Sequence, residues 1–278
     1  MSKYTIMQAK KVLISGATDG IGLQTAKDMA RKGYKVYIHG RTRAKAQEAC
    51  EQVKAETGSE LVDFMYADLS SFEEMEIMQQ MLYAKMDSLD VLINNAGVIS
   101  HERAITPDGF ELTFQVNHLS YFILGNYALP LLKQAKEARI VNVSSQVHAS
   151  DLDFDNLQGE KHYTANAAYS LSKLCNVLYT YYLAYKLLDT GITVNCLHPG
   201  VIKTKLLRSG FGAGFGSPLP EGSKNSVYVA TSADLDISSG LYFVNQKPVR
   251  SSAVSYIPEI QQQLWDLSEK YTGLKYSF

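Results

Sequence analysis

The stretch Val12-Leu13-Ile14-Ser15-Gly16-Ala17-Thr18-Asp19-Gly20-Ile21-Gly22 decides the fold of this chain of 278 residues. It opens with a short apolar run, which is typical of a strand buried on both faces. Glycines then permit a tight turn, and residues 20–32 have the apolar spacing of a helix that ends at Gly33. The stretch therefore predicts a strand, a glycine-rich turn and a helix in direct succession.

The rest of the chain repeats this alternation. Further strands are predicted at 36–38, 61–66, 91–93, 140–143, 192–197 and 241–244, and further helices at 44–57, 70–85, 109–135, 168–189, 221–231 and 258–271. Ser70 is expected to cap its helix, because Glu73 follows three residues later. The alternation favours a single domain over 1–278, an α/β doubly wound parallel sheet of about seven strands with helices on both faces.

The composition excludes several classes of protein. Hydrophobic residues make up 46% and charged residues 20%, and 27 basic against 28 acidic residues leave a net charge of −1. No basic field exists to attract a nucleic acid. Three scattered cysteines, no signal peptide and no membrane-spanning segment favour a soluble, cytoplasmic protein. No histidines stand at a ligand spacing from a cysteine or acid, so no metal site is expected.

The glycine-rich turn is predicted to hold a phosphate. Its backbone can approach an anion closely, and the following helix offers unpaired N–H groups at the positive end of its dipole. The spacing Gly-x-x-x-Gly-x-Gly differs from the common Gly-x-Gly-x-x-Gly, so a plain tight turn remains an alternative. Ligands of doubly wound sheets bind beyond the carboxyl ends of the strands, where this turn is expected to lie.

The residues after the second strand indicate which dinucleotide binds. An NAD site has an acid there, which accepts hydrogen bonds from the ribose hydroxyls. The stretch His39-Gly40-Arg41-Thr42-Arg43 has none. Arg41 could instead pair with a 2′-phosphate. This favours NADP(H), with solvated loop cations as the alternative.

A tyrosine followed four residues later by a lysine occurs three times, at Tyr169/Lys173, Tyr182/Lys186 and Tyr271/Lys275. A neighbouring ammonium favours the phenolate, which would let a tyrosine exchange its proton near neutral pH. With 18 tyrosines the spacing alone proves little. Only Tyr169 follows a strand ending in two serines at the carboxyl edge of the sheet. Tyr182 is interpreted as packing or subunit contact and Tyr271 as surface.

Supporting residues are predicted around this pair. Ser144 and Ser145 can hold a carbonyl oxygen, and because side chains alternate along a strand only one of the two is expected to face the site. His148, in the loop after Ser145, is interpreted as solvated or supporting rather than catalytic, as is His162. His118 and His198 are expected to have structural roles.

The order of these motifs resembles the short-chain dehydrogenase/reductase superfamily, classical type. The motifs are the glycine turn, Asn94-Asn95-Ala96-Gly97, Asn117, Ser145, Tyr169-x-x-x-Lys173 and Pro199-Gly200. The segments Arg139–Ser145, Asn156–Lys161 and Tyr169–Asn176 are similar to its retinol-dehydrogenase-like branch. The resemblance covers nearly the whole chain. It implies a Rossmann fold and an oxidoreductase that transfers a hydride between nicotinamide and a carbonyl or alcohol.

The resemblance also implies a role for each matching residue. Tyr169 would donate or accept the proton, Lys173 would lower its pKa and bind the nicotinamide ribose, and Ser145 would orient the substrate carbonyl. Asn117 would bend its helix and help to hold a water of the proton relay. The cofactor would contact Gly16, Asp19, Gly20, Ile21, Gly22, Arg41, Asp68, Leu69, Asn95, Ala96, Gly97, Tyr169, Lys173, Pro199, Gly200, Ile202 and Thr204.

Three features depart from the family pattern or extend it. Ser145 and Tyr169 are 24 residues apart, about twice the usual spacing, and the extra residues near 150–165 match an insertion of the branch. Ser15 stands where threonine is usual. Membrane-bound members carry an apolar amino-terminal anchor, and membrane residence is not expected here because the chain begins almost at its first strand. A homodimer or homotetramer through the helices at 109–135 and 168–189 is what the family implies.

Residues 205–220 are predicted to form a lid over the substrate. The part from 209 to 220 is rich in glycine and is expected to be a mobile loop. Its apolar inner face favours a lipophilic carbonyl or alcohol. That face would be formed by Leu206, Leu207, Phe211 and Phe215.

Other functions remain open at this point. A non-catalytic nucleotide-sensing protein on the same fold is one, although it would not need the complete Ser145–Tyr169–Lys173 set. An isomerase or dehydratase is another, and it would need a larger carboxyl-terminal domain. A light-driven pigment reductase is the third, and colour in the purified protein or activity only under illumination would distinguish it.

Overall fold

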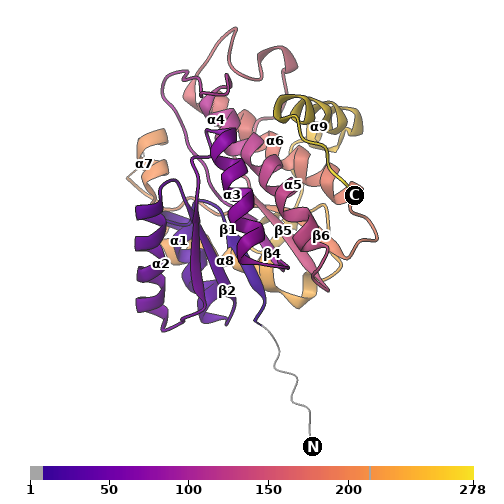
Figure 1. The fold of residues 1–278 in the computed structure, drawn as a ribbon. Helices are drawn as coiled ribbons and strands as arrows, with labels where there is room; N and C mark the ends of the chain where they lie inside the picture. Colours follow the sequence, from indigo (N-terminus) through magenta and orange to yellow (C-terminus); the bar gives the residue numbers. More distant parts are fainter. Residues whose placement is uncertain (1–8, 213) are drawn as a thin grey trace, which may run out of the picture.

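The structure is a computed structural model that describes residues 9–212 and 214–278. Its centre is one sheet with the strand order β3-β2-β1-β4-β5-β6-β7-β8 (Figure 1). The strands are β1 (Lys11–Ile14), β2 (Lys35–Gly40), β3 (Val62–Tyr66), β4 (Val91–Asn94), β5 (Ala138–Val143), β6 (Ile192–His198), β7 (Tyr242–Val244) and β8 (Lys247–Val249). The first seven run parallel, and β8 pairs antiparallel with β7. The predicted doubly wound α/β fold is confirmed.

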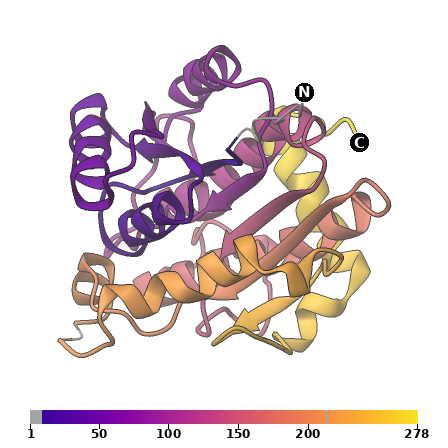
Figure 2. The same ribbon diagram turned by 90° about the horizontal axis from the view of Figure 1, so that it is seen from below.

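Helices cover both faces of this sheet, as Figure 2 shows. One layer consists of α1 (Gly20–Arg31), α2 (Arg43–Thr57) and α8 (Leu219–Thr231). The other layer consists of α3 (Phe72–Lys85), α5 (Ser120–Leu132) and α6 (Ala165–Lys186), with α9 (Pro258–Thr272) packed on α6. The short helix α4 (Leu112–Phe114) precedes α5, and α7 (Lys205–Phe211) precedes α8.

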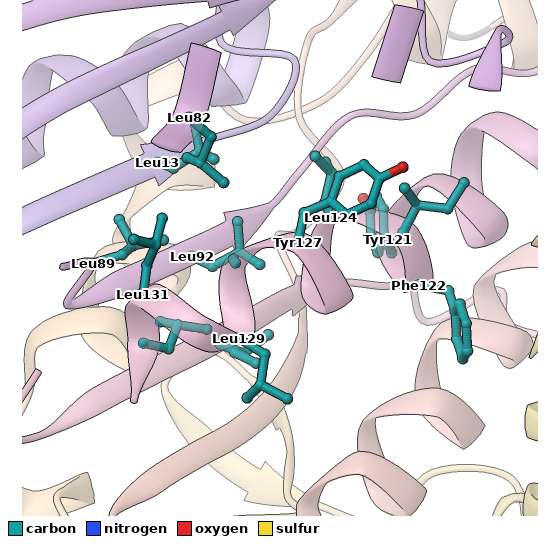
Figure 3. Close-up of a cluster of buried hydrophobic side chains, with 14 of the residues drawn as sticks. Leu13, Leu82, Leu89, Leu92, Tyr121, Phe122, Leu124, Tyr127, Leu129 and Leu131 are labelled. Atoms are coloured by element: carbon teal, nitrogen blue, oxygen red, sulfur yellow. The ribbon is translucent and has the colours of Figure 1, made fainter. Parts of the chain in front are cut away.

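Alternate residues of the central strands face the two helical layers. Leu13 of β1 and Leu92 of β4 belong to the cluster with α3 and α5, part of which is drawn in Figure 3. Val12 and Ile93 belong to the cluster under α1 and α8. All four side chains are fully buried. This burial on both faces is why the strands are unbroken apolar runs in the sequence.

The order of the sheet reverses between β1 and β4. The chain moves outward from β1 to β3 and then returns across β1 to form β4. The connections that follow these two neighbouring strands therefore leave the sheet edge in opposite directions, and a crevice opens between them. The fold thus places a ligand site beside the glycine-rich turn.

Two predictions about α3 and the chain terminus are wrong in detail. Helix α3 begins at Phe72 and is capped by Ser71, whose Oγ accepts a hydrogen bond from the Glu74 N–H at 3.3 Å. Ser70 is not the cap because its hydroxyl donates to the Asp68 carboxylate at 2.7 Å. Tyr271, expected at the surface, is half-buried and packs against the rings of Phe110 and Phe114.

The predicted helix over 109–135 and the end of the sheet also differ from expectation. Residues Gln115–Leu119 form a π-helical turn between α4 and α5, so the helix is interrupted. Strand β8 was not predicted. It returns from β7 through Asn245 and Gln246, which have φ angles of 50° and 62°. Left-handed backbone at two successive residues is typical of a tight hairpin.

Helix α5 is covered by the carboxyl-terminal part of the chain. The rings of Trp265 and Tyr276 pack edge-on against Phe122, with centroid distances of 4.9 and 5.0 Å. The Tyr276 hydroxyl donates to the Phe122 carbonyl at 2.6 Å and lies 2.8 Å from the Tyr179 hydroxyl. A subunit contact through α5 would therefore have to displace this segment.

No helix within 9–212 and 214–278 has both the length and the hydropathy needed to cross a bilayer. In the same ranges no group of three histidine, cysteine, aspartate or glutamate side chains is placed to hold a metal ion.

The cover over α5 predicts a large effect of one methyl group. A β-carbon at Gly125 would overlap the Tyr179 hydroxyl and lie 2.6 Å from the Tyr276 hydroxyl. We expect Gly125→Ala to lower the free energy of unfolding by about 1–3 kcal/mol, because overpacking a buried contact forces both rings to move. Urea unfolding measures this. Pro130→Ala, at an exposed position of the same helix, is the control, and equal stability of the two variants would contradict the packing described.

Candidate active site

One cavity of about 760 Å³ lies at the carboxyl edge of the sheet. Loops that follow β1, β2, β3, β4, β5 and β6 line it, together with α6 and α7. Every predicted cofactor and catalytic residue lines this cavity except Asn117. Lining residues that the sequence did not single out include Thr18, Lys45, Val98, Gln146, Val147 and Lys205.

The glycine-rich turn is shaped by close packing against the loop after β4. Gly16 has a φ angle of +63°, and a β-carbon there would lie 2.7 Å from the Ala96 Cα. A β-carbon at Gly22 would overlap the Gly16 carbonyl and the Asn95 amide. The turn delivers the amides of Ile21 and Gly22 into the first turn of α1, where no preceding helical residue can accept from them. Such amides can bind an anion.

Asp19 occupies the start of α1. Its carboxylate accepts a hydrogen bond from the Gly20 N–H at 2.8 Å and pairs with the Lys205 ammonium at 2.6 Å. Burial alone would raise its pKa, but the two contacts outweigh burial and the pKa is lowered. Helix α7 is therefore attached to the glycine-rich turn by an ion pair.

His39 fixes this turn from the side of β2, a role that the sequence did not reveal. Its Nδ1 accepts from the Gly16 N–H at 3.2 Å, and its Nε2 lies 3.1 Å from the Ala67 carbonyl, to which it donates. Burial lowers the pKa of His39 to about 4, so the ring is neutral. Only the apolar run around His39 could have indicated that its ring is buried.

Arg41 stands at the far end of the cavity from the catalytic pair. Its side chain is 64% exposed, and its Nε lies 3.7 Å from the Asp68 carboxylate. Lys45, in the first turn of α2, also lines the cavity. Asp68 accepts from the Ser70 amide and hydroxyl as well. Arg41 and Lys45 are thus two cations near the end of β2, and the Asp68 carboxylate orients the Arg41 guanidinium.

Ser145, Tyr169 and Lys173 meet at the other end of the cavity. Helix α6 is capped by Thr164, and Tyr169 and Lys173 lie one turn apart on the face toward β5. The three side chains are 7%, 7% and 3% exposed. Ser145 hydrogen-bonds the Tyr169 side chain. The Ser144 hydroxyl instead donates to the Lys173 backbone carbonyl at 2.7 Å, so the two serines point in different directions.

Burial changes the proton affinity of this pair in a way that the sequence did not predict. It raises the pKa of Tyr169 to about 12, against the hydrogen bond from Ser145, and lowers the pKa of Lys173 to about 7. The lowering of the tyrosine pKa by Lys173 that the resemblance implies stays a prediction. The Lys173 Nζ donates to the Val143 carbonyl at 3.0 Å and lies 5.6 Å from the Tyr169 ring centroid. Both groups are therefore favoured in their neutral forms.

Asn117 lies in the π-helical turn and behind the cavity wall. Its Oδ1 accepts from the Val98 N–H at 2.7 Å, and its Nδ2 donates to the Val98 carbonyl and to the Ser172 hydroxyl. The side chain thus joins the loop after β4 to α6. The irregular helix expected around Asn117 is present, while its part in a proton relay stays a prediction.

The predicted lid is partly helical. Thr204 caps α7 by accepting from the Leu207 N–H at 3.0 Å, and the helix ends at Gly212, whose φ angle is +61°. The expectation of a loop from residue 209 is therefore wrong for its first residues. Leu206, Leu207 and Phe215 line the cavity, whereas the side chain of Phe211 lies outside the described part of the chain.

A doubly wound sheet with this turn at its switch point and a buried Ser–Tyr–Lys group beyond it defines a dinucleotide-binding oxidoreductase. A family model described as short chain dehydrogenase matches residues 10–211, and the chain belongs to this family. The protein is accordingly an oxidoreductase that uses NAD(H) or NADP(H), and the identification made from the sequence is confirmed.

Individual relatives agree with the retinol-dehydrogenase-like branch. Human polyprenol dehydrogenase is 38% identical over 280 residues, which cover 94% of this chain and 84% of that protein. Mouse retinol dehydrogenase 14 is 38% identical, covering 97% and 87%, and bovine retinol dehydrogenase 12 is 36% identical, covering 96% and 87%. The structure of an uncharacterised protein from Mycobacterium paratuberculosis superposes with a TM-score of 0.81 at 28% identity, covering 97% and 95%.

The cavity fits a nicotinamide dinucleotide. The anionic diphosphate requires hydrogen-bond donors, and the free amides at the start of α1 provide them. A β-carbon at Gly97 would lie in van der Waals contact with the Lys173 Nζ, at 3.5 Å, so the loop after β4 and Lys173 border the same part of the cavity. The cavity volume lies within the range of cofactor sites.

The buried histidines predict a loss of stability in mild acid. Burial lowers the pKa of His39 and His198 to about 4 and that of His118 to about 3. Unfolded histidine takes up a proton near pH 6.5, so between that pH and about 4 the unfolded chain binds more protons. We expect urea unfolding, followed by Trp265 fluorescence, to give a lower free energy of unfolding at pH 5 than at pH 7.5.

A variant assigns part of this loss to one ring. His39→Gln can still donate to the Ala67 carbonyl but takes up no proton, so its decrease between the two pH values should be smaller. The carboxylates with lowered pKa, such as Asp19, titrate below this window. An unchanged decrease in the variant would mean that His39 is already charged at pH 7.5 or is accessible to protons in the folded state.

Proposed function

We propose that the protein is an NADP-dependent oxidoreductase of lipophilic carbonyl compounds or the corresponding alcohols, with Tyr169 as general acid and base. The observation that carries the proposal is the convergence of Ser145, Tyr169 and Lys173 in one cavity whose opposite end holds Arg41. The family assigns the cofactor class, and the residues of this chain suggest the preference and the substrate.

Tyr169 is suited to deliver a proton to a carbonyl oxygen. With a pKa of about 12 its hydroxyl keeps the proton at neutral pH, so the reduction direction begins from the protonated phenol. Ser145 is hydrogen-bonded to Tyr169 and can donate to the same substrate oxygen. A nicotinamide held in the cavity would supply the hydride for reduction or take it up in alcohol oxidation. In the oxidation direction Tyr169 accepts the proton of the alcohol.

Lys173 stabilises the phenolate form of Tyr169. Because its pKa is about 7, Lys173 carries a proton in a substantial fraction of molecules near neutral pH. A cation 5.6 Å from the phenol ring stabilises the phenolate that forms when Tyr169 gives up its proton. Lys173 therefore acts on the charged form of Tyr169 rather than on its resting state.

The preference for NADP(H) rests on charge at the adenosine end. Arg41 and Lys45 can both approach a 2′-phosphate, and Asp68 holds the Arg41 guanidinium in place. A planar guanidinium pairs with phosphate through two parallel hydrogen bonds. Asp68 itself is already engaged by Arg41 and Ser70.

The substrate class rests on the apolar wall at the catalytic end. Val98, Val147, Leu206, Leu207 and Phe215 line it. Relatives at 36–38% identity carry the names of polyprenol and retinol dehydrogenases, which are names of alcohol-oxidising enzymes. A hydrocarbon substrate would bury these side chains without leaving polar groups unpaired.

Tyr169→Phe tests the chemistry. We expect it to lower kcat by about 100-fold or more, with an unchanged Kd for NADPH, when NADPH absorbance is followed in the dark with a panel of lipophilic aldehydes and ketones. Tyr182→Phe is the matched control, because Tyr182 also precedes a lysine by four residues but does not line the cavity. Near-normal turnover by Tyr169→Phe would refute the mechanism, and turnover only under illumination would favour a pigment reductase.

Arg41→Ala tests the cofactor preference. Loss of the guanidinium should raise the Kd of NADPH about tenfold or more and leave that of NADH nearly unchanged, because only the former carries the 2′-phosphate. Titration of intrinsic fluorescence measures both values. Arg43→Ala removes an exposed cation that does not line the cavity and is the control. Equal effects of Arg41→Ala on both cofactors would show that Arg41 does not select between them.

A further inference from the structure

We propose that His148 is a positioning residue that holds the Ser145 backbone and ties it to the segment after β8. This inference rests on the proposed function, because it concerns the serine that would orient the substrate carbonyl. His148 is not among the residues that line the cavity, so it acts through Ser145 and touches neither substrate nor cofactor.

The two ring nitrogens of His148 have different partners. Nδ1 lies 2.6 Å from the Ser145 carbonyl oxygen, and Nε2 lies 3.0 Å from the Ser252 backbone nitrogen. A backbone N–H can only donate, so Nε2 must accept and Nδ1 must carry the proton. His148 is therefore a neutral donor to the Ser145 carbonyl, and Ser252 selects this tautomer. Burial also lowers the pKa of His148, which favours the neutral ring.

Ser145 needs this support because it has just left the sheet. The Ser144 N–H still donates to the Leu197 carbonyl of β6 at 2.7 Å. The Ser145 carbonyl instead accepts two hydrogen bonds from His148, one from its ring and one from its backbone N–H at 3.2 Å. The orientation of this peptide sets the direction of the Ser145 side chain, and small displacements of an orienting group reduce catalysis strongly.

Ser252 is in turn anchored to the helix that carries the catalytic tyrosine. Its neighbour Ser251 has its hydroxyl 2.7 Å from the Tyr181 hydroxyl of α6, and the Ser251 N–H donates to the Tyr256 hydroxyl at 3.1 Å. The Ser252 hydroxyl also donates to the Ala149 carbonyl at 2.8 Å. His148 thus closes a ring of contacts from Ser145 through the segment after β8 to α6, which bears Tyr169.

Substitutions of His148 separate its two hydrogen bonds. His148→Asn places an amide nitrogen near the Nδ1 position and can keep the donor to Ser145. His148→Gln places its amide near the Nε2 position and can keep only the contact with Ser252. His148→Ala keeps neither. We expect kcat to fall about tenfold in the Gln and Ala variants and about threefold or less in Asn, with the Kd of NADPH unchanged in all three.

The pattern among these variants decides the proposal. A merely structural role would move the free energy of unfolding without this order of kcat values. The proposal is overturned if His148→Ala keeps wild-type kcat, if Gln retains more activity than Asn, or if all three lose activity equally. Urea unfolding of each variant is the control that shows each variant to be folded under the conditions of the kcat measurement.

Ser252 offers a second pair of variants that isolates one N–H group. Ser252 has a φ angle of −56°, which proline adopts without strain. Ser252→Pro and Ser252→Ala both lack the hydroxyl, but only proline also lacks the donor to His148. We expect a kcat several-fold lower for Ser252→Pro than for Ser252→Ala. Equal values would overturn the link to this segment.

The tautomer can be measured without any substrate. Two-bond ¹H–¹⁵N spectra of the wild type at pH 7 should show His148 protonated at Nδ1, and protonation at Nε2 would overturn the inferred contacts. If none of the lipophilic aldehydes and ketones in the panel makes the wild type oxidise NADPH, the proposed function is refuted instead. The two failures are therefore distinguishable.

Discussion

A phenol and an amine buried side by side are the constraint on which this site depends. Tyr169 and Lys173 are both almost inaccessible to solvent, and burial moves their pKa values in opposite directions, up to about 12 for the phenol and down to about 7 for the amine. Burial disfavours the charged form of each group, and an opposite charge on the neighbouring group favours it. At rest Tyr169 is neutral, whereas Lys173 carries a proton in a substantial fraction of molecules near neutral pH. This suits a site that handles one proton for each hydride.

The sheet makes such burial tolerable because it supplies polar atoms where its strands end. The Lys173 Nζ donates a hydrogen bond to the Val143 carbonyl at the last residue of β5. Asn117 binds both polar atoms of the Val98 backbone and the hydroxyl of Ser172 on α6. The π-helical turn rotates Asn117 into this position. The irregular backbone here is therefore part of how the wall behind the catalytic pair is built.

The sequence predicted those features that depend on interactions between residues close together in the chain. The apolar run Val12–Ile14, the glycine-rich turn and the spacing of Tyr169 and Lys173 each act within a few residues, and they located the fold, the turn and the pair. Contacts between distant segments were not readable in this way. His39 looked like a loop residue, yet it bridges Gly16 and Ala67 across two strand ends.

The errors have the same origin. Ser70 had the right spacing for a cap, but Asp68 engages its hydroxyl. The local spacing of Tyr169 and Lys173 could not reveal that burial raises the pKa of Tyr169, because the depth of burial is a property of the whole fold. The hairpin of β7 and β8 depends on two non-glycine residues with positive φ, which carry no strong turn signal.

The carboxyl-terminal part of the chain connects these observations. Trp265 and Tyr276 cover α5 and Tyr179, so the layer that supports the catalytic helix is completed by residues added after the dinucleotide-binding core. The Ser251 hydroxyl contacts the hydroxyl of Tyr181, which lies on another face of α6 than Tyr179. Helix α6 is thus held from two sides by the same terminal region, while its other face presents Tyr169 and Lys173. The geometry of the proton-transfer group is in this sense supported by residues that lie far along the chain, which explains why motifs around the pair describe its chemistry but not its alignment.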